Sequence, residues 1–438
     1  MNLRSHPYES YRPSNSEWVD QTPAEWEETR VKDLFRLVTD KAPVDNDHEL
    51  LSLYASIGVR PRKDLEARGN KASSTDGYWL VKKGDIVVNK LLAWMGSVGL
   101  SEYDGVTSPA YDVLRKTSKL VDVRYFSYLF RTEIAKQIFK RNSRGIMDMR
   151  LRLYFDKLGA ISVPVPPFST QQAIATYIDT KTRQIDRQID LLGQKATQYG
   201  KLKQSLINEA VTRGLDKSAP MKDSGVTWIG QMPEHWELKR IKEVCDINKN
   251  TLTEKTPASY EFDYVDIGSV TYGVREYTKE RMTFDAAPSR AKRIVQKGDT
   301  IISTVRTYLK AIATIDTEVV DLIVSTGFAV ISPRKKIADR YCSYLLTSNC
   351  IVDEICALSN GVSYPATNAT VIGDLFFLIP PLAEQVSIGA YLDDKTAQID
   401  RTVTAIGSHI DKLKDLRKAL INDVVTGKIK VVSEGQAV

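Results

Sequence analysis

One phrase of about thirty residues occurs twice in this chain, and the repeat limits what the chain can fold into. PVPPFSTQQAIATYIDTKTRQIDRQIDLL begins at Pro164, and LIPPLAEQVSIGAYLDDKTAQIDRTVTAI begins at Leu378. In both copies two prolines precede a helical pattern, and proline blocks the extension of a helix toward its N-terminus. The sequence therefore predicts two long helices that begin in the same way.

The repeat extends beyond the helices. Three further pairs match in the same order: SNSEWVDQTPAEW (14–26) with SGVTWIGQMPEHW (224–236), KGDIVVNK (83–90) with KGDTIIST (297–304), and YFSYL (125–129) with YCSYL (341–345). The offset drifts by a few residues, as expected where surface loops have gained or lost residues. The chain is therefore interpreted as one unit of about 200 residues present twice.

Each helical segment carries an apolar or aromatic residue at every seventh position. These positions are Ile178, Ile185, Leu192, Tyr199 and Leu206 in the first copy, and Leu392, Ile399, Ile406, Leu413 and Leu420 in the second. More apolar residues follow four positions later, and this alternation is typical of a coiled-coil seam. Each helix is expected to be ~65–70 Å long at 1.5 Å per residue, and its apolar stripe needs a partner.

The two helices are expected to pair with each other in an antiparallel manner. Parallel pairing would require the chain to travel back ~65 Å between them, whereas the linker LDKSAPMKDSGVTWIG is short. A generic dimerisation stalk is the alternative that an apolar heptad pattern leaves open.

The predicted fold class is α+β. Two similar globular domains of mixed helices and strands are joined by two long antiparallel coiled-coil helices with approximate two-fold symmetry. The expected segments are a first domain (1–165), a first long helix (166–218), a second domain (219–379), and a second long helix with a tail (380–438). Within the domains, DIVVNKLL and TIISTV are predicted strands, and YFSYLFRTEIAKQIF (125–139) is predicted to be one amphipathic helix.

Composition excludes few functions, and the familiar catalytic motifs are missing. The net charge of +6 permits nucleic-acid binding without requiring it. Four cysteines without a CxxC pair and four scattered histidines predict buried free thiols and no metal site. The sequence has no phosphate-binding loop, GxGxxG, HExxH or GxSxG motif, and Asp85 and Asp299 in the KGD turns are interpreted as turn residues. Without a signal peptide or a long apolar run, the expected location is the cytoplasm.

The globular domains contain cationic clusters interleaved with aromatic residues. Each cluster alone is more often a solvated surface, but together they favour a polyanionic ligand, because arginine suits both guanine edges and phosphates. The candidate DNA-binding residues are Arg60, Arg62, Lys63, Lys90, Arg144, Arg150 and Arg152 in the first domain, and Arg290, Lys292, Arg293, Arg306, Lys310 and Tyr364 in the second.

With these features together, the chain resembles the DNA-specificity subunit of a Type I restriction-modification system. The resemblance rests on the two tryptophan-containing openings, the KGD turns, the Pro-Pro entries followed by Gln171 and Gln385, and the endings LINEAVTRGL (206–215) and LINDVVTGKI (420–429). The first copy departs from the pattern: Asn15 and Asp20 stand where the second has glycines, and Thr170 stands where the second has Glu384.

The resemblance implies a non-catalytic subunit whose two target-recognition domains each bind one half of a divided, asymmetric double-stranded DNA site. The helices would set the spacer and dock two methyltransferase (modification) subunits, and motor-nuclease (restriction) subunits would join the full complex. S-adenosylmethionine, ATP and magnesium would be bound by those partners and not by this chain, and no membrane would be involved. Two alternatives remain open: a two-headed coiled-coil scaffold for protein partners, and a methyltransferase or nuclease with a degenerate motif.

Overall fold

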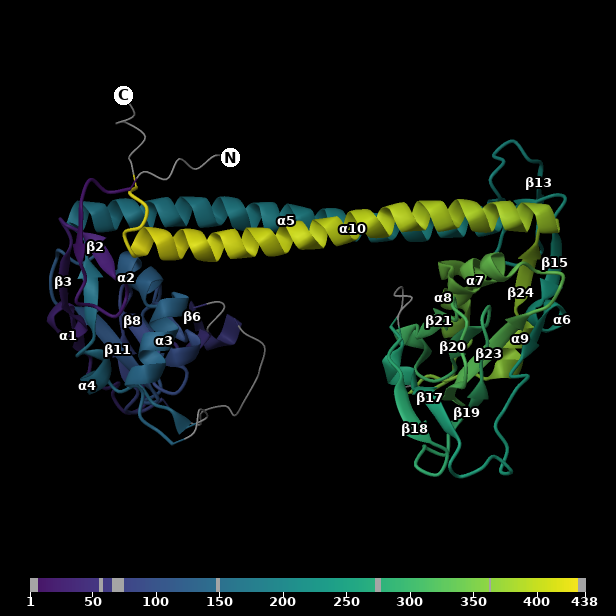
Figure 1. Cartoon of the computed structure of the whole chain (residues 1–438), viewed down its shortest axis with the longest axis horizontal. Helices are drawn as coiled ribbons and strands as arrows, with labels where there is room; N and C mark the ends of the chain where they lie inside the picture. Colours follow the sequence, from purple (N-terminus) through teal and green to yellow (C-terminus); the bar gives the residue numbers. More distant parts are fainter. Residues whose placement is uncertain are drawn as a thin grey trace. The chain divides into compact units, whose positions relative to one another are not determined.

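A computed structural model describes residues 7–54, 58–64, 75–146, 150–271, 277–361 and 364–431 (Figure 1). The chain forms two compact units, the first from Met1–Leu192 with Ser408–Val438 and the second from Gly193–Gly407. Each unit contains one globular head and a part of both long helices, α5 (Phe168–Arg213) and α10 (Leu382–Val425). The compact units therefore cut across the four segments expected from the sequence.

Each head is built around an antiparallel sheet with the same strand order. In the first head the order is β4 (Phe35–Leu37), β11 (Tyr111–Lys116), β8 (Ile86–Asn89), β9 (Val98–Leu100). In the second head it is β16 (Cys245–Ile247), β23 (Phe328–Pro333), β20 (Thr300–Ser303), β21 (Ile312–Thr314). The KGD turns lead into β8 and β20, so the strands predicted from the β-branched runs are confirmed.

Two further strand pairs are repeated, and the remaining sheets differ. The repeated pairs are β1 (Tyr11–Pro13) with β2 (Gln21–Pro23), β3 (Glu27–Arg30) with β12 (Ser162–Val165), β13 (Met221–Asp223) with β14 (Gln231–Pro233), and β15 (Glu237–Arg240) with β24 (Phe376–Ile379). The first head adds β5 (Leu51–Tyr54) with β6 (Gly58–Pro61) and β7 (Trp79–Val81) with β10 (Gly105–Thr107). The second adds one sheet in the order β18 (Glu280–Thr283), β17 (Glu261–Val265), β22 (Leu322–Ser325), β19 (Ala291–Ile294).

Short helices complete the heads. They are α1 (Val31–Leu34), α2 (Val123–Leu129), α3 (Glu133–Asn142) and α4 (Phe155–Leu158) in the first, and α6 (Ile241–Val244), α7 (Asp339–Thr347), α8 (Asn349–Ala357) and α9 (Ala369–Asp374) in the second. The described residues also include the 3-10 turns η1 (Arg62–Asp64), η2 (Ala93–Met95), η4 (Ile267–Ser269) and η5 (Thr307–Leu309).

The prediction of one helix over 125–139 is wrong, because Thr132 divides it. The Thr132 hydroxyl accepts a hydrogen bond from the Ala135 amide at 3.1 Å and donates one to the Leu129 carbonyl at 2.8 Å. Threonine is a favourable N-cap residue, so the chain ends α2 and starts α3 here although the apolar pattern continues.

The long helices run antiparallel within each unit, as the short linker predicted. In the first unit the Tyr125 hydroxyl lies 3.2 Å from the Pro164 carbonyl and 3.0 Å from the Val425 carbonyl, so the start of α5 meets the end of α10. Further along, Asp186 pairs with Arg417 at 3.1 Å.

The second unit has the same contacts at matching positions. The Tyr341 hydroxyl lies 2.9 Å from the Leu378 carbonyl and 3.3 Å from the Val211 carbonyl, and Lys203 pairs with Asp400 at 2.7 Å.

Most of the predicted seam is buried. The buried positions are Ile178, Ile185, Leu392, Ile399, Ile406, Leu413 and Leu420, and Leu192, Tyr199 and Leu206 are partly buried. Ile207, beside Leu206, is fully buried in the core of the second head. A helix that packs on both a partner helix and a globular head needs an apolar face wider than a strict heptad seam.

One matched pair of core positions illustrates how the two cores differ. Phe35 and Phe126 pack edge to face with ring centroids 5.3 Å apart in the first head. Cys245 and Cys342 take these places in the second, with their sulfurs 3.8 Å apart. Both are buried free thiols, as predicted, whereas Cys350 and Cys356 are free but only partly buried.

Candidate nucleic-acid interface

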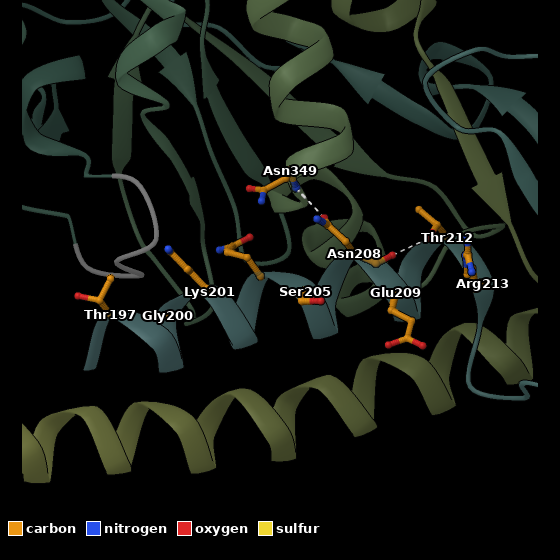
Figure 2. A pocket seen from close by; sticks show the side chains of 10 residues that line it. Thr197, Gly200, Lys201, Ser205, Asn208, Glu209, Thr212, Arg213 and Asn349 are labelled. Atoms are coloured by element: carbon orange, nitrogen blue, oxygen red, sulfur yellow. Dashed lines mark hydrogen bonds between the residues drawn. The ribbon is translucent and has the colours of Figure 1, made fainter. Parts of the chain in front are cut away.

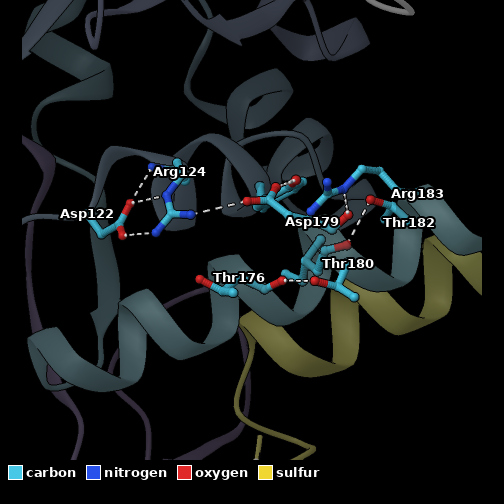
Figure 3. A network of polar contacts seen from close by, with 9 residues as sticks. Asp122, Arg124, Thr176, Asp179, Thr180, Thr182 and Arg183 are labelled. Atoms are coloured by element: carbon cyan, nitrogen blue, oxygen red, sulfur yellow. Dashed lines mark hydrogen bonds and ion pairs between the residues drawn. The ribbon is translucent and has the colours of Figure 1, made fainter. Parts of the chain in front are cut away.

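A polar network attaches the first head to α5 (Figure 3). The Arg124 guanidinium binds Asp122, which caps α2, at 2.8 Å and Asp179 of α5 at 3.2 Å. The Tyr128 hydroxyl donates a hydrogen bond to the same Asp179 carboxylate. Because two side chains of the head bind one carboxylate of the helix, the head has a defined orientation on the helix.

The second head is attached to α10 by the matching residues. Arg340 binds Asp393 with two nitrogens, and the Tyr344 hydroxyl lies 2.7 Å from Asp393 and 3.0 Å from Thr396. Arg340 also binds Asp316 at 2.6 Å. The attachment of head to helix is therefore a repeated feature of the fold.

The glutamine in each Pro-Pro entry strengthens this attachment. Gln171 is 1 % exposed, and its side chain accepts from the Asp122 amide at 2.9 Å and donates to the Pro166 carbonyl at 2.8 Å. Gln385 is equally buried, accepts from the Ala338 amide at 2.8 Å, and donates to the Pro380 carbonyl at 2.8 Å. An amide serves here because one side chain satisfies both a buried donor and a buried acceptor.

The two KGD aspartates are both buried but have different partners. Asp85 accepts from the Lys82 amide at 2.8 Å and forms a bidentate pair with Arg115, at 2.8 and 2.7 Å. Asp299 accepts from the Gln296 amide at 2.9 Å, and burial raises its pKa above the ordinary value. Both carboxylates close their own turns, which supports the structural interpretation over a catalytic one.

Each head presents an exposed turn and loop joined by matching backbone hydrogen bonds. In the first head the Leu153 amide donates to the Lys90 carbonyl at 2.9 Å, and Arg144 and Arg152 exchange two backbone bonds of 2.9 Å. We call residues 90–96 with 144–146 and 150–154 the first turn–loop surface. It brings together three of the predicted arginines.

The second head repeats this arrangement. The Thr367 amide donates to the Thr304 carbonyl at 2.8 Å, and Asn360 and Ala366 exchange two backbone bonds of 2.9 Å. Residues 304–310 with 360–361 and 364–367 are the second turn–loop surface, which brings together Arg306, Lys310 and Tyr364.

The first turn–loop surface is apolar in its turn and cationic in its loop. Leu92 and Met95 of the turn are about half exposed, and Ile146 of the loop is 99 % exposed. The exposed side chains of Arg150 and Arg152 follow it, and Arg144 pairs with Asp156 at 3.1 Å. Lys90 is largely buried and pairs with Asp112 at 3.5 Å, so it is a structural cation of the head.

The second turn–loop surface has its cations in the turn. The Arg306 guanidinium lies 4.7 Å from the centre of the Tyr364 ring, which is 62 % exposed, and Tyr308 and Leu309 form a half-exposed tip. Lys310 binds Asp353 at 2.8 Å. Arg306 and Lys310 have φ of 50° and 52°, a left-handed conformation that costs energy for residues other than glycine and is often found at functional sites.

The other candidate residues lie outside these surfaces. Arg60 donates to the Tyr103 hydroxyl at 3.2 Å, and Lys63 pairs with Glu49. Arg62 lines a neighbouring cavity of about 400 Å³ together with Leu91.

In the second head the three remaining candidates lie on or beside β19. Arg290 pairs with Asp266 at 3.0 Å, Lys292 lies over the Phe284 ring, and Arg293 donates to the Thr251 hydroxyl at 3.1 Å. Burial lowers the pKa of Arg293. Sequence reasoning missed the exposed apolar residues Leu92, Met95, Ile146 and Leu309, since runs such as LLAWM are typical of a core.

Two negative findings hold for the described part of the chain. Within it, no group of three or more His, Cys, Asp or Glu side chains is arranged to hold a metal ion. Among the helices described, none is both long and apolar enough to cross a membrane.

The family model for the "Type I restriction modification DNA specificity domain" matches the chain twice, at residues 23–195 and 233–406. The Type I restriction enzyme MjaVIII specificity subunit of Methanocaldococcus jannaschii is 23 % identical over 428 residues, which cover 94 % of each chain. The putative type I restriction enzyme MjaX specificity subunit of the same organism is 23 % identical over 323 residues, covering 73 % of this chain and 71 % of that protein.

Solved structures share the fold. One chain comes from a study titled as the structural basis of assembly and conformational transition of the type I R-M system. It superposes with a TM-score of 0.68 at 16 % identity, covering 93 % of this chain and 99 % of its own length. The HsdS subunit from Thermoanaerobacter tengcongensis gives a TM-score of 0.54 at 17 % identity, covering 93 % and 98 %.

Proposed function

The chain belongs to the family of Type I restriction modification DNA specificity domains and is a specificity subunit with two recognition domains; from this premise we propose that each turn–loop surface contacts one half of a divided double-stranded DNA site. The observation that carries the proposal is the pair of surfaces itself. Matching backbone hydrogen bonds join the turn and loop in both heads, while the exposed side chains differ. Two surfaces with the same backbone and different side chains are suited to contact two different DNA sequences.

The exposed chemistry fits base contacts. An arginine supported by a tyrosine ring, as Arg306 is by Tyr364, holds a planar fork that matches the edge of guanine. In the first head, Arg150 and Arg152 supply the cations and Ile146 supplies an apolar contact of the kind that the thymine methyl group accepts.

The chain's role is binding without catalysis. The sequence lacks the motifs for nucleotide or methyl-donor binding, and both KGD aspartates are used within their turns. In this proposal, S-adenosylmethionine, ATP and magnesium are bound by partner methyltransferase and restriction subunits, which act with this chain in the cytoplasm.

Two methyltransferase subunits dock on the long helices. Leu202 of α5 and Leu416 of α10 occupy matching positions in the repeat, and both side chains are nearly half exposed. A pair of equivalent exposed leucines on two helices suits two copies of one partner.

Selection from a random pool of duplex DNA tests the function, with the methyltransferase subunit present. We expect an enriched site with two unlike halves separated by a spacer of fixed length. A palindromic site would contradict the proposal, because the two surfaces are chemically different. Absence of any DNA selection would favour the two-headed protein scaffold instead.

A matched deletion tests whether the helices set the spacer. Removing Ile185–Leu191 together with Ile399–Ala405 takes one heptad, or about 10.5 Å, from each helix, which corresponds to about three base pairs. A folded, partner-bound variant is expected to select a different spacer with the same two half-sites. If it selects the original spacer, the helices do not set the distance.

A further inference from the structure

A cavity of about 650 Å³ opens in the first unit between the head and the C-terminal half of α10. Met95 and Gly96, at the end of the turn η2, form part of its border, so it adjoins the first turn–loop surface. The Lys136 side chain crosses Gly96 so closely that a Cβ there would lie 2.7 Å from Lys136 Cε. A cation is thereby held where the cavity meets the turn.

The lining of the cavity is rich in cations. Arg131 and Lys136 come from the head, and Arg417 and Lys418 come from α10. The acidic residues of the lining are Glu133, which already binds Lys136 at 2.7 Å, and Asp423, whose nearest ion pair is with Lys428 at 3.7 Å. The pairs that Arg417 and Lys418 form with Asp186 (3.1 Å) and Asp415 (3.8 Å) are on the partly exposed helix surface.

Two of these cations are close enough to repel each other. The pKa of Arg131 is lowered first by burial and then by the positive charge of Arg417. Two like charges in a half-buried position raise the energy of the unliganded protein, and an anion placed between them would offset that cost. The guanidinium fork of arginine matches the geometry of a phosphate group.

The second unit keeps only one of the four cations at the matching positions, because Lys203 corresponds to Arg417. Thr347, Val352 and Gln204 stand where the first unit has Arg131, Lys136 and Lys418. Figure 2 shows the corresponding groove, in which Asn208 of α5 accepts a hydrogen bond from the Asn349 amide at 2.8 Å. The groove of the second unit is lined by Lys201 and Arg213 instead, so the cations contributed by Arg131, Lys136 and Lys418 are a feature of the first unit and not a requirement of the repeated fold.

We propose that this cavity binds a phosphate group of the DNA backbone beside the half-site contacted by the first turn–loop surface. The proposal rests on the DNA-binding function proposed above. It assigns to the first unit a backbone contact through Arg131, Lys136 and Lys418, which have no cationic counterparts at the matching positions of the second unit. Such a contact strengthens binding to all sequences and carries no base preference.

The test compares two double variants with equal loss of charge. In R131Q/K418Q two cavity cations are neutralised, and in the control K82Q/K119Q two exposed lysines of the same unit are neutralised. Binding of a mixed-sequence 40-base-pair duplex is measured against potassium chloride concentration, with the methyltransferase subunit present. Each lost phosphate contact is expected to reduce the slope of log affinity against log salt by about 0.9 and to weaken binding about five- to tenfold near 0.1 M salt.

R131Q/K418Q is expected to show this reduction, and the control is expected to match the wild type. If R131Q/K418Q does not fold, the single variant K418E is measured in its place, because Lys418 is exposed and its replacement should not disturb folding. An unchanged salt slope in the cavity variant overturns the proposal. Loss of methyltransferase binding with an unchanged slope also overturns it, and identifies an acidic segment of that protein as the occupant.

A second experiment distinguishes failure of this proposal from failure of the proposed DNA-binding function. Inorganic phosphate is added at constant ionic strength, and the thermal unfolding midpoint of the wild type is compared with that of R131Q/K418Q. If phosphate stabilises only the wild type while no form of the protein binds duplex DNA, the ligand is free phosphate and the assignment to DNA is overturned. The proposal is supported if the wild type binds DNA and R131Q/K418Q shows a reduced slope of log affinity against log salt.

Discussion

The two units of this molecule are most alike where each head is attached to the helices and least alike at the turn–loop surfaces. The central contacts of the attachment are repeated, with Arg124 and Asp179 in the first unit matching Arg340 and Asp393 in the second. The surfaces keep their backbone bonds but exchange their chemistry, so Leu92 in one turn corresponds to Arg306 in the other. The comparison teaches that the duplicated units share the attachment of their heads, while the side chains of the two surfaces differ.

The strongest test of the preserved part replaces the buried glutamine in each entry. Gln171→Ala and Gln385→Ala are each expected to lower the free energy of unfolding of their own unit by about 3–4 kcal/mol, because each leaves a buried amide and carbonyl without partners. Hydrogen–deuterium exchange followed by mass spectrometry locates the loss, at α2 for the first variant and at α7 for the second. A large effect in only one unit would break the equivalence of the two attachments.

The KGD turns extend the comparison, because the matching aspartates Asp85 and Asp299 have different partners. Asp85→Asn is expected to cost about 2–3 kcal/mol, since it leaves the largely buried Arg115 guanidinium without its bidentate partner. Urea unfolding of Asp85→Asn beside Asp85→Asn/Arg115→Leu gives the measurement. The double variant should recover part of the loss, and a double variant less stable than the single one would contradict the ion-pair account.

The divergent surfaces are compared through their turns. Arg306→Ala is expected to weaken binding to the selected site by about 1–3 kcal/mol and to relax one base position in one half-site. Leu92→Ala, at the matching position of the first head, is expected to leave that position unchanged. Repeating the selection with each variant checks both expectations. Uniform weakening across all sequences by Arg306→Ala would identify a phosphate contact instead.

The smallest expected effect concerns Asp299. Its replacement by asparagine is expected to stabilise the protein, whereas Asp85→Asn is expected to destabilise it. Because the folded-state pKa of Asp299 is raised by burial, its contribution to stability is greatest at acid pH and is lost as pH rises through that pKa. Asp299→Asn removes this loss while it keeps an acceptor for the Gln296 amide. At pH 7 the variant is expected to gain up to about 1 kcal/mol, and the gain should vanish below the ordinary aspartate pKa. Thermal unfolding of the variant and the wild type is measured at pH 7 and pH 3.5. An equal gain in stability at both pH values would show that the gain does not come from titration of Asp299.

The sequence was sufficient for the repeated parts because their signals are local. The Pro-Pro entries, the seam from Ile178 and from Leu392, and the β-branched strands depend on neighbours along the chain. The surfaces depend on contacts between distant segments. For example, Lys90, which directly follows β8, pairs with Asp112 of β11, and no spacing rule reveals such a pair.

The left-handed turn at Arg306 and Lys310 could not be predicted either, because glycine, asparagine and aspartate are the usual signals of such a conformation and neither residue is one of them. The break of the predicted helix at Thr132 is an intermediate case. The capping signal was present, but the apolar periodicity on both sides was stronger evidence for a continuous helix.

The first unit is completed by the last part of the chain, since Tyr125 contacts the Val425 carbonyl and the Tyr11 hydroxyl contacts the Gly427 carbonyl. During synthesis these contacts cannot form until the whole second unit has been translated, which takes ~10–50 s at 5–20 residues per second. Throughout that interval the apolar stripe of α5 that Leu413 and Leu420 later cover has no partner from its own chain. The nascent first head is thus a substrate for chaperones or for premature association with another nascent chain, and the order of translation becomes a determinant of how much correctly assembled protein is made.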